Sequence, residues 1–323
     1  MKIENQYIYD FGPDNKPVAY CDENEVVQFA TEDCFGGQIK TEKDCAEEID
    51  FNHTNPATGP LYVNQAEVGD VLAVDILKID VAEQGAVCTL QGYGCMWNQC
   101  ELRTKILPVK DGVVTFNDVQ WQCTPMVGVI GTASNEKVSS GFSFNGGGNM
   151  DSRIITAGST VYFPVRVKGA LLAMGDLHAT MGDGEVCETG LEIKGVVTVR
   201  VRVIKNFELN WPVTETKRGW FVNTNGNTAD KAIIRGYNEL TRLITNAYGW
   251  DKTDAVMYLS LQAYVEANQA CLDPEENDNE GATFRVGVPK IASKKPLIGK
   301  VNLSLKTNLS CLQTGRIICG CRK

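Results

Sequence analysis

Gly195-Val196-Val197-Thr198-Val199-Arg200-Val201-Arg202-Val203 carries valine at every second position from residue 197, with threonine or arginine between. Successive side chains of a strand point to opposite faces, so this segment is predicted to be a half-buried β-strand. The segment from Val68 to Ile79 repeats the alternation over much of its length, and shorter β-rich runs lie at residues 113–116, 126–130, 160–167 and 170–174. Frequent Asn-Gly and Asp-Gly turn signals separate them. The pattern predicts a mainly β chain of α+β class, with sandwich-like or barrel-like sheets.

Residues 229–271 depart from this pattern and predict a helical hairpin near residues 229–270. Thr228 is a suitable N-cap for the first helix and Gly249 its stop. Asp251 is expected to cap a second helix that runs from Lys252 to about Asn268. The apolar positions of the first helix recur at helical spacing, at Ala229, Ile233, Tyr237, Leu240, Ile244 and Ala247.

The hairpin lies between two β-rich segments, residues 1–228 and 282–323. About forty residues are few for an independent core, so we expect the hairpin to pack on the sheets. The sequence therefore predicts one domain over residues 1–323.

Composition excludes several classes of protein. The chain has 323 residues, 43% hydrophobic and 22% charged, as in an ordinary globular protein. No apolar run reaches the ~18 residues that a membrane-spanning helix needs. The net charge of -9 disfavours nucleic acid as a partner. The first residues, MKIENQ, lack the pattern of a secretory signal, so a cytoplasmic location with reduced cysteines is predicted.

The segment from Gly175 to Cys187, GDLHATMGDGEVC, carries the most chemistry. Four ionisable groups fall within ten residues: Asp176, His178, Asp183 and Glu185. On an extended backbone the first two share a face, and so do the last two. Carboxylates with an imidazole suit Zn²⁺ or another divalent cation, and a carboxylate left over can act as a general base. Since Gly-Asp and Asp-Gly are also turn dipeptides, the spacing alone leaves a plain turn equally open.

Two other polar segments attract attention. The glycine-rich run from Phe142 to Asp151 ends in Asn149-Met-Asp151 and lacks the Gly-Lys-Ser of a phosphate-binding loop. The run from Glu32 to Ile39 places Asp33 before a Gly-Gly turn. By itself, the second segment is more typical of a structural turn than of a site.

Taken together, these segments resemble a known family. The pattern Gly175-Asp-Leu-His-Ala179 followed by Gly182-Asp-Gly-Glu185 is similar to the signature of the acetamidase/formamidase family. Further matching motifs follow the family order across about residues 30–190: Asp33-x-x-Gly-Gly-Gln-Ile39, Asn55-Pro-Ala-Thr-Gly-Pro60, Gly69-Asp70, Thr124-Pro-Met-x-Gly128 and Gly147-Gly-Asn-Met-Asp151.

The resemblance implies hydrolysis of small aliphatic amides to a carboxylate and ammonia, a largely β architecture and a homo-oligomer. Met181 stands where the family pattern has Gln, a change expected to alter a substrate contact. Val68 stands where Pro is expected, a change read as neutral. The choice among formamide, acetamide and a larger amide or imide stays open.

These observations predict a metal-assisted amidase. A divalent cation, zinc first with calcium or manganese as alternatives, would polarise the amide, and a free carboxylate would handle the proton of the attacking water. The assigned residues are the metal ligands Asp176, His178 and Asp33, the catalytic carboxylates Glu185 and Asp183, and the substrate-binding residues Asn149, Asp151 and Gly148. Glu185 is an alternative to Asp33 as the third metal ligand.

Two alternatives come from other classes of protein. A non-catalytic β-sandwich protein could use the acidic site for Ca²⁺ or a small ligand. An amidase with a cysteine nucleophile would choose among Cys34, Cys123 and Cys187, with Cys187 favoured by its proximity to Glu185 in the sequence.

Overall fold

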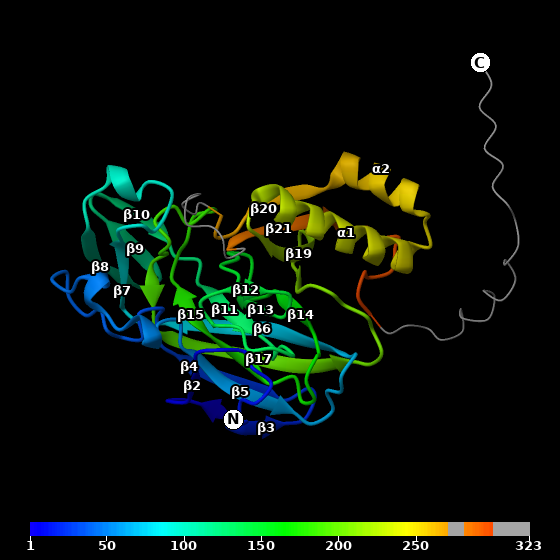
Figure 1. Ribbon diagram of the computed structural model, residues 1–323, viewed down its shortest axis with the longest axis horizontal. Helices are drawn as coiled ribbons and strands as arrows, with labels where there is room; N and C mark the ends of the chain where they lie inside the picture. Colours follow the sequence, from blue (N-terminus) through cyan, green and yellow to red (C-terminus); the bar gives the residue numbers. More distant parts are fainter. Residues whose placement is uncertain (271–280, 300–323) are drawn as a thin grey trace, which may run out of the picture.

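The computed structural model describes residues 1–270 and 281–299 (Figure 1). This part of the chain is mostly β-structure with two α-helices, which confirms the predicted fold class. One sheet has nine strands, in the order β1 (Lys2–Ile3), β4 (Val26–Thr31), β17 (Gly195–Ile204), β6 (Val71–Val81), β14 (Thr160–Pro164), β18 (Val213–Glu215), β19 (Gly219–Gly226), β21 (Ala282–Pro289) and β20 (Tyr264–Ala267).

The other sheet has twelve strands. Its main path is β10 (Val119–Gln122), β9 (Val113–Phe116), β8 (Arg103–Lys110), β7 (Gln84–Thr89), β16 (Glu192–Ile193), β15 (Leu172–His178), β11 (Met126–Gly131), β13 (Gly147–Asn149) and β12 (Ser143–Phe144). Strand β5 (Ala57–Val63) joins this path through β15 and also pairs with β2 (Tyr7–Ile8) and β3 (Ala19–Cys21). Three short 3-10 helices lie at Ala46–Glu48, Phe51–His53 and Trp97–Gln99.

The alternation in β17 decides which side chains enter the main core. Its valines at 197, 199 and 201 are fully buried in the largest hydrophobic cluster, which strands of both sheets build. The opposite face carries Arg200 and Arg202, whose guanidinium groups lie 2.9 and 2.6 Å from the carboxylate of Asp75 on β6. The predicted two-faced strand is confirmed, because the polar face finds its partner on the neighbouring strand.

The helical hairpin consists of α1 (Ala229–Tyr248) and α2 (Lys252–Gln262). The predicted caps are confirmed: Thr228 and Asp251 accept backbone hydrogen bonds at the two N-termini, and Gly249 ends α1 with a φ of 70°. The prediction that the second helix extends to about Asn268 was wrong. The chain leaves the helix after Gln262 because residues 264–267 pair with β21 as strand β20.

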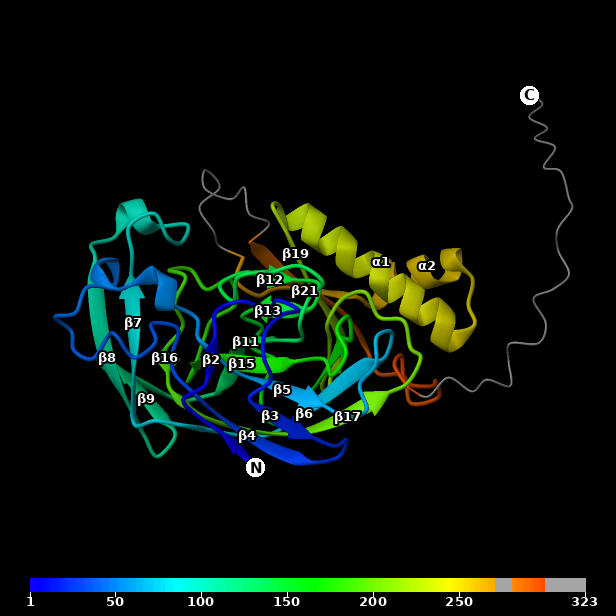
Figure 2. The ribbon, with the colours of Figure 1, turned by 60° about the horizontal axis from the view of Figure 1, so that its bottom comes forward.

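The hairpin packs against the edge of the nine-stranded sheet, over β19 and β21 (Figures 1 and 2). Leu240, Leu243 and Ile244 of α1 share one hydrophobic cluster with Trp220, Val222, Val286 and Val288 of those strands. No helix in the described ranges has the length and apolar character needed to cross a membrane. Beyond β21, the predicted β-rich segment from residue 300 onward lies outside the described residues.

Replacing Thr228 by alanine should lower the free energy of unfolding by about 1 kcal/mol, because the backbone N–H of Lys231 loses its acceptor at the start of α1. Urea unfolding followed by circular dichroism measures the effect. Thr253→Ala, at an exposed position inside α2, is the control and should be neutral or slightly stabilising. Equal losses in both variants would contradict the capping role.

Candidate active site

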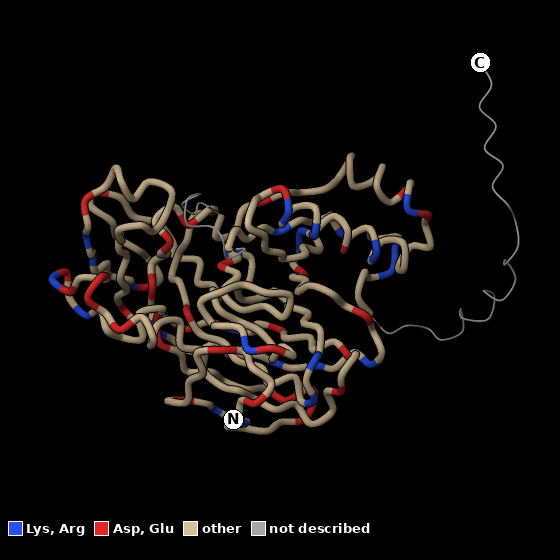
Figure 3. The backbone as a smooth tube through the Cα atoms, in the orientation of Figure 1, with Lys and Arg blue, Asp and Glu red and all other residues tan. Residues whose placement is uncertain are grey.

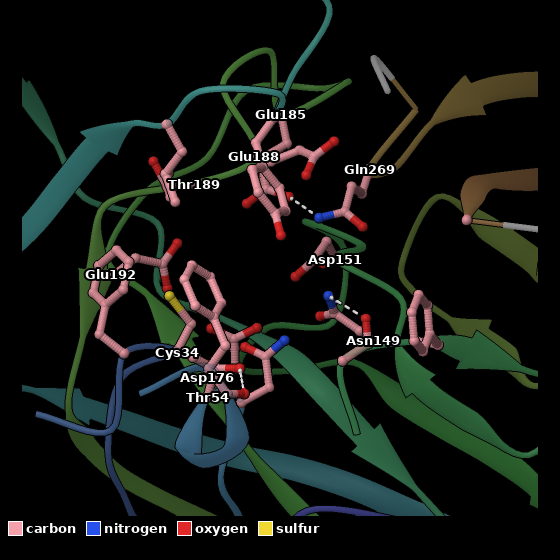
Figure 4. Close-up of a pocket in the computed structure, with 18 of the residues that line it drawn as sticks. Cys34, Thr54, Asn149, Asp151, Asp176, Glu185, Glu188, Thr189, Glu192 and Gln269 are labelled. Carbon is pink, nitrogen blue, oxygen red and sulfur yellow. Dashed lines mark hydrogen bonds between the residues drawn. The ribbon is translucent and has the colours of Figure 1, made fainter. Parts of the chain in front are cut away.

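A pocket of about 430 Å³ lies where β15, β16 and the segment after β13 meet the end of β20. The side chains labelled in Figure 4 surround a common space. Asp176 and His178 come from β15, Glu192 from β16 and Asp151 from the segment that follows β13. Glu185 reaches the pocket from the long connection between β15 and β16.

Asp176 and His178 lie close together, but not through the regular strand alternation that the sequence suggests. Regular alternation would place them on one face, but Asp176 has a φ of 53°, in the left-handed region, so β15 is kinked at this residue. Asp151 and Glu185 also have positive φ, of 44° and 47°. Left-handed backbone at three site carboxylates is the kind of local strain that functional sites hold.

Gly128 of β11 makes this kink possible. It lies opposite Asp176 in the β11–β15 pairing, and both neighbouring pairs are in register. A Cβ at this position would lie 2.4 Å from Asp151 Oδ1 and 2.7 Å from Asp176 Oδ2. The absence of a side chain on β11 therefore lets two carboxylates approach the same backbone.

His178 is at the centre of the cluster. Its Nε2 atom lies 3.2 Å from Glu192 Oε1, 3.3 Å from Asp176 Oδ1 and 3.7 Å from Asp151 Oδ1, and its Nδ1 atom lies 3.7 Å from Glu185 Oε1. All five side chains are at most 4% exposed. The structure thus brings together four of the residues proposed from the sequence, Asp151, Asp176, His178 and Glu185, and adds Glu192.

The cluster has a large excess of acidic over basic side chains. Over most of the described chain, acidic and basic residues are interspersed (Figure 3), whereas none of the described residues that line this pocket is Lys or Arg. Burial, followed by the charges of Glu185 and Asp176, raises the pKa of Asp151 well above its usual value. Burial also raises the pKa of Glu192, to about 8. Although burial lowers the pKa of His178, the charges of Glu192 and Asp176 raise it well above its usual value.

The residues present fit a divalent cation. Several buried atoms have no hydrogen-bond partner: both carboxylate oxygens of Asp151, Oδ1 of Asp176, Oε2 of Glu192 and Nδ1 of His178. Two groups have ligand atoms mutually within 4.8 Å, namely Asp151, His178 and Glu185, and Cys34, Asp176 and Glu192. Buried unpaired acceptors are costly, and a bound cation would satisfy them.

The segment just after β20, far along the chain, holds Glu185 in place. Gln269, two residues beyond β20, donates from Nε2 to Glu185 Oε2 at 2.9 Å. The backbones are also joined, because Gly184 N–H donates to the carbonyl of Asn268 at 2.8 Å. Burial raises the pKa of Glu185, while His178 opposes this rise.

Other predicted site residues lie outside the pocket lining. Asp183 is 2.7 Å from Arg285 Nη2, and its side chain is 43% exposed. Asp33 accepts a hydrogen bond from the backbone N–H of Gly37, and burial raises its pKa to about 6. Gly148 has a φ of 79° and packs so close to the Phe142 carbonyl that a Cβ would lie 2.2 Å from it. Met181 is buried outside the pocket lining.

Of the three cysteines considered as nucleophiles, the one that lines the pocket is not Cys187, which the sequence favoured. Cys34 lines the pocket, whereas neither Cys123 nor Cys187 does. Burial, then the charges of Glu192 and Asp176, raises the pKa of Cys34 well above its usual value. A thiol held in its protonated form is a poor nucleophile, so this environment disfavours the cysteine mechanism.

The family assignment rests on a match over most of the chain. A model of the acetamidase/formamidase family matches residues 2–143 and 143–263. The chain belongs to this family. The recognition from the motifs is confirmed, and so, at the level of the family, is the prediction of an amidase-type enzyme.

Solved acetamidase structures agree with this assignment. The Bacillus halodurans acetamidase is 35% identical, with a TM-score of 0.85 over 90% of this chain and 97% of its own. A predicted acetamidase/formamidase of Thermoanaerobacter tengcongensis is 37% identical, with a TM-score of 0.85 over 89% and 95%. A curated relative from Schizosaccharomyces pombe is 26% identical over 250 residues, 57% of this chain; the match spans 61% of that relative's length.

Two residues of this acetamidase/formamidase site were missed in the sequence. Glu192 had a local signal, because Leu191-Glu192-Ile193 alternates apolar and acidic residues before the valine-rich strand. Antiparallel pairing of β15 with β16 then places Glu192 directly opposite His178. Gln269 had no local signal, since only the pairing of β20 with β21 brings it to Glu185.

Proposed function

We propose that the protein hydrolyses a carboxylic amide to a carboxylate and ammonia by metal-assisted attack of water. One observation carries the proposal: four buried carboxylates surround a single histidine, and no described Lys or Arg lines their pocket. Membership of the acetamidase/formamidase family supplies the reaction class.

Asp176, His178, Asp151 and Glu192 would hold the cation, since their unpaired atoms are those that a metal would satisfy. When bound, a divalent cation acts as a Lewis acid on the amide carbonyl and lowers the pKa of a bound water. The oxygen-rich set with one imidazole accepts zinc, and also calcium or manganese. Zinc, a homo-oligomer and a cytoplasmic location stay predictions from the sequence.

Glu185 is the proposed general base. Gln269 binds its Oε2 atom, which leaves Oε1 to take the proton from the attacking water. As the new C–O bond forms and the C–N bond breaks, Glu185 returns this proton to the nitrogen, which leaves as ammonia. Proton return is essential because an amide anion is a very poor leaving group. A pKa raised by burial suits a carboxyl group that must both accept and return a proton near neutral pH.

Asn149 is proposed to orient the substrate amide. It lines the pocket, and its Nδ2 donates to the carbonyl of Gly141 at 3.4 Å. Its Oδ1 atom is buried without a hydrogen-bond partner and can accept an N–H of the substrate amide. Asp151, predicted as a substrate-binding residue, is better placed as a cation ligand because it lies against His178.

Removal of the metal is the direct test. Treatment with a chelator should abolish ammonia release from acetamide and formamide, and added Zn²⁺, Mn²⁺ or Ca²⁺ should restore it. Asp176→Ala should lose at least about 100-fold in kcat/KM together with bound metal, because a cation ligand is gone. Asp80→Ala, which removes an exposed carboxylate, is the matched control.

Three other results would contradict the proposal in different ways. Activity that survives both chelation and Asp176→Ala would exclude metal assistance. Loss only after alkylation of thiols would favour Cys34 as a nucleophile. Metal binding without turnover of any amide would favour the non-catalytic binding protein.

A further inference from the structure

The pocket is larger than a short amide needs, and part of its lining is apolar. At about 430 Å³ it falls within the size range of sites for drug-sized ligands. A molecule of four non-hydrogen atoms such as acetamide fills on the order of 100 Å³, taking about 30 Å³ per atom as for water. Phe35, Ile49 and Leu90 line the pocket; Phe35 and Leu90 belong to one small hydrophobic cluster, and Ile49 packs against it. Apolar lining of this extent indicates a ligand with an apolar part.

Two aromatic rings lie further out in the same lining. Phe51 starts the 3-10 helix Phe51–His53 and Tyr93 comes directly after a turn, and their rings stack with centroids 6.3 Å apart and planes 9° apart. Both are large and well exposed, at 47% and 42%. An exposed, parallel aromatic pair that lines a pocket offers faces and edges on which another flat ring can pack.

Charge restricts what such a substituent can be. The described lining contains Glu185, Glu188 and Glu192 and no Lys or Arg. An anionic substituent would find no Lys or Arg to pair with in the described lining, and any of these carboxyl groups that is ionised would repel it. A charged group of either sign would lose water against Phe35, Ile49 and Leu90 without gaining a partner from them, so the favoured group is neutral and apolar.

We infer that the preferred substrate is an amide with a neutral, ring-sized apolar substituent, held by Phe35, Ile49 and Leu90 with the Phe51–Tyr93 pair. The inference rests on the proposed amide hydrolysis and names the class of amide. Benzamide and phenylacetamide represent this class. Each buried methylene contributes about 0.8 kcal/mol, roughly fourfold in affinity, so at least a tenfold preference over acetamide in kcat/KM is expected.

The test measures kcat/KM for acetamide, propionamide, benzamide and phenylacetamide on the metal-loaded enzyme. Ile49→Trp, which fills the apolar part, and Phe51→Ala, which removes one of the stacked rings, should each lower the benzamide-to-acetamide ratio at least about fivefold. Leu261→Trp is the control, because it adds the same ring on exposed α2, away from the pocket. Its ratio should equal that of the unchanged protein.

Binding gives a readout that does not depend on turnover. Saturation-transfer NMR should show benzamide bound more tightly than acetamide, with the difference reduced by Phe51→Ala. Turnover of acetamide equal to or faster than that of benzamide, with a ratio unmoved by either variant, would overturn the inference and leave the proposed function standing. If no amide is hydrolysed but benzamide still binds in this way, the proposed function fails while the apolar subsite remains.

Discussion

Glu185→Gln is expected to lower kcat for amide hydrolysis by about 10²- to 10⁴-fold, the range that general-base catalysis contributes. Glutamine keeps the shape of the side chain, and its amide can still meet Gln269, but it cannot take a proton from water. The fold and the bound metal should be retained, since other carboxylates hold the cation. Ammonia release, metal analysis and circular dichroism on one preparation check all three points.

Asp183→Asn is the discriminating companion to this variant. Asp183 is the other carboxylate that the sequence suggested as the base, but it faces Arg285 outside the pocket lining. Asp183→Asn should therefore keep most of the activity, as should Glu136→Gln at an exposed position. A fully active Glu185→Gln with an inactive Asp183→Asn would transfer the base to Asp183.

Gly128→Ala is expected to remove both metal and activity, with a loss of at least about 100-fold in kcat/KM. The new methyl group would lie 2.4 Å from Asp151 Oδ1 and 2.9 Å from the backbone carbonyl of Asp176, so the two carboxylates must separate. Overpacking of this kind also costs about 1–3 kcal/mol of stability. Metal content and turnover are measured below the unfolding temperature of the variant.

Gly182→Ala is the matched control for this effect. Gly182 belongs to the same signature segment as Asp176, yet no described residue other than its chain neighbours has an atom within 4 Å of the position its Cβ would take. Only a small change in activity or metal content is expected. Equal losses in both variants would show that the loss in Gly128→Ala does not depend on its contact with the two carboxylates. Full metal content in Gly128→Ala would contradict the close approach of Asp151 and Asp176 to Gly128.

Local patterns in the sequence were sufficient to predict the two-faced strand and the helix caps. The valines of residues 197–203, the Thr228 and Asp251 caps and the Gly249 stop each act on backbone within a few residues, so spacing alone reveals them. The same holds for Asp176 and His178, which the short signature placed together. The second helix was predicted too long because the pairing of residues 264–267 with β21 is not local.

The sequence by itself determined the mainly β class, the helical hairpin, the family and three of the four carboxylates of the cluster, all but Glu192. Only the tertiary structure decided which carboxylates share His178: Glu192 arrives by cross-strand pairing, and Glu185, not Asp183, turns into the pocket. The physical reason is that alternation fixes side-chain direction only on regular backbone. At Asp151, Asp176 and Glu185 the backbone is left-handed, and contacts distant in the sequence, with Gly128 and Gln269, stabilise that conformation.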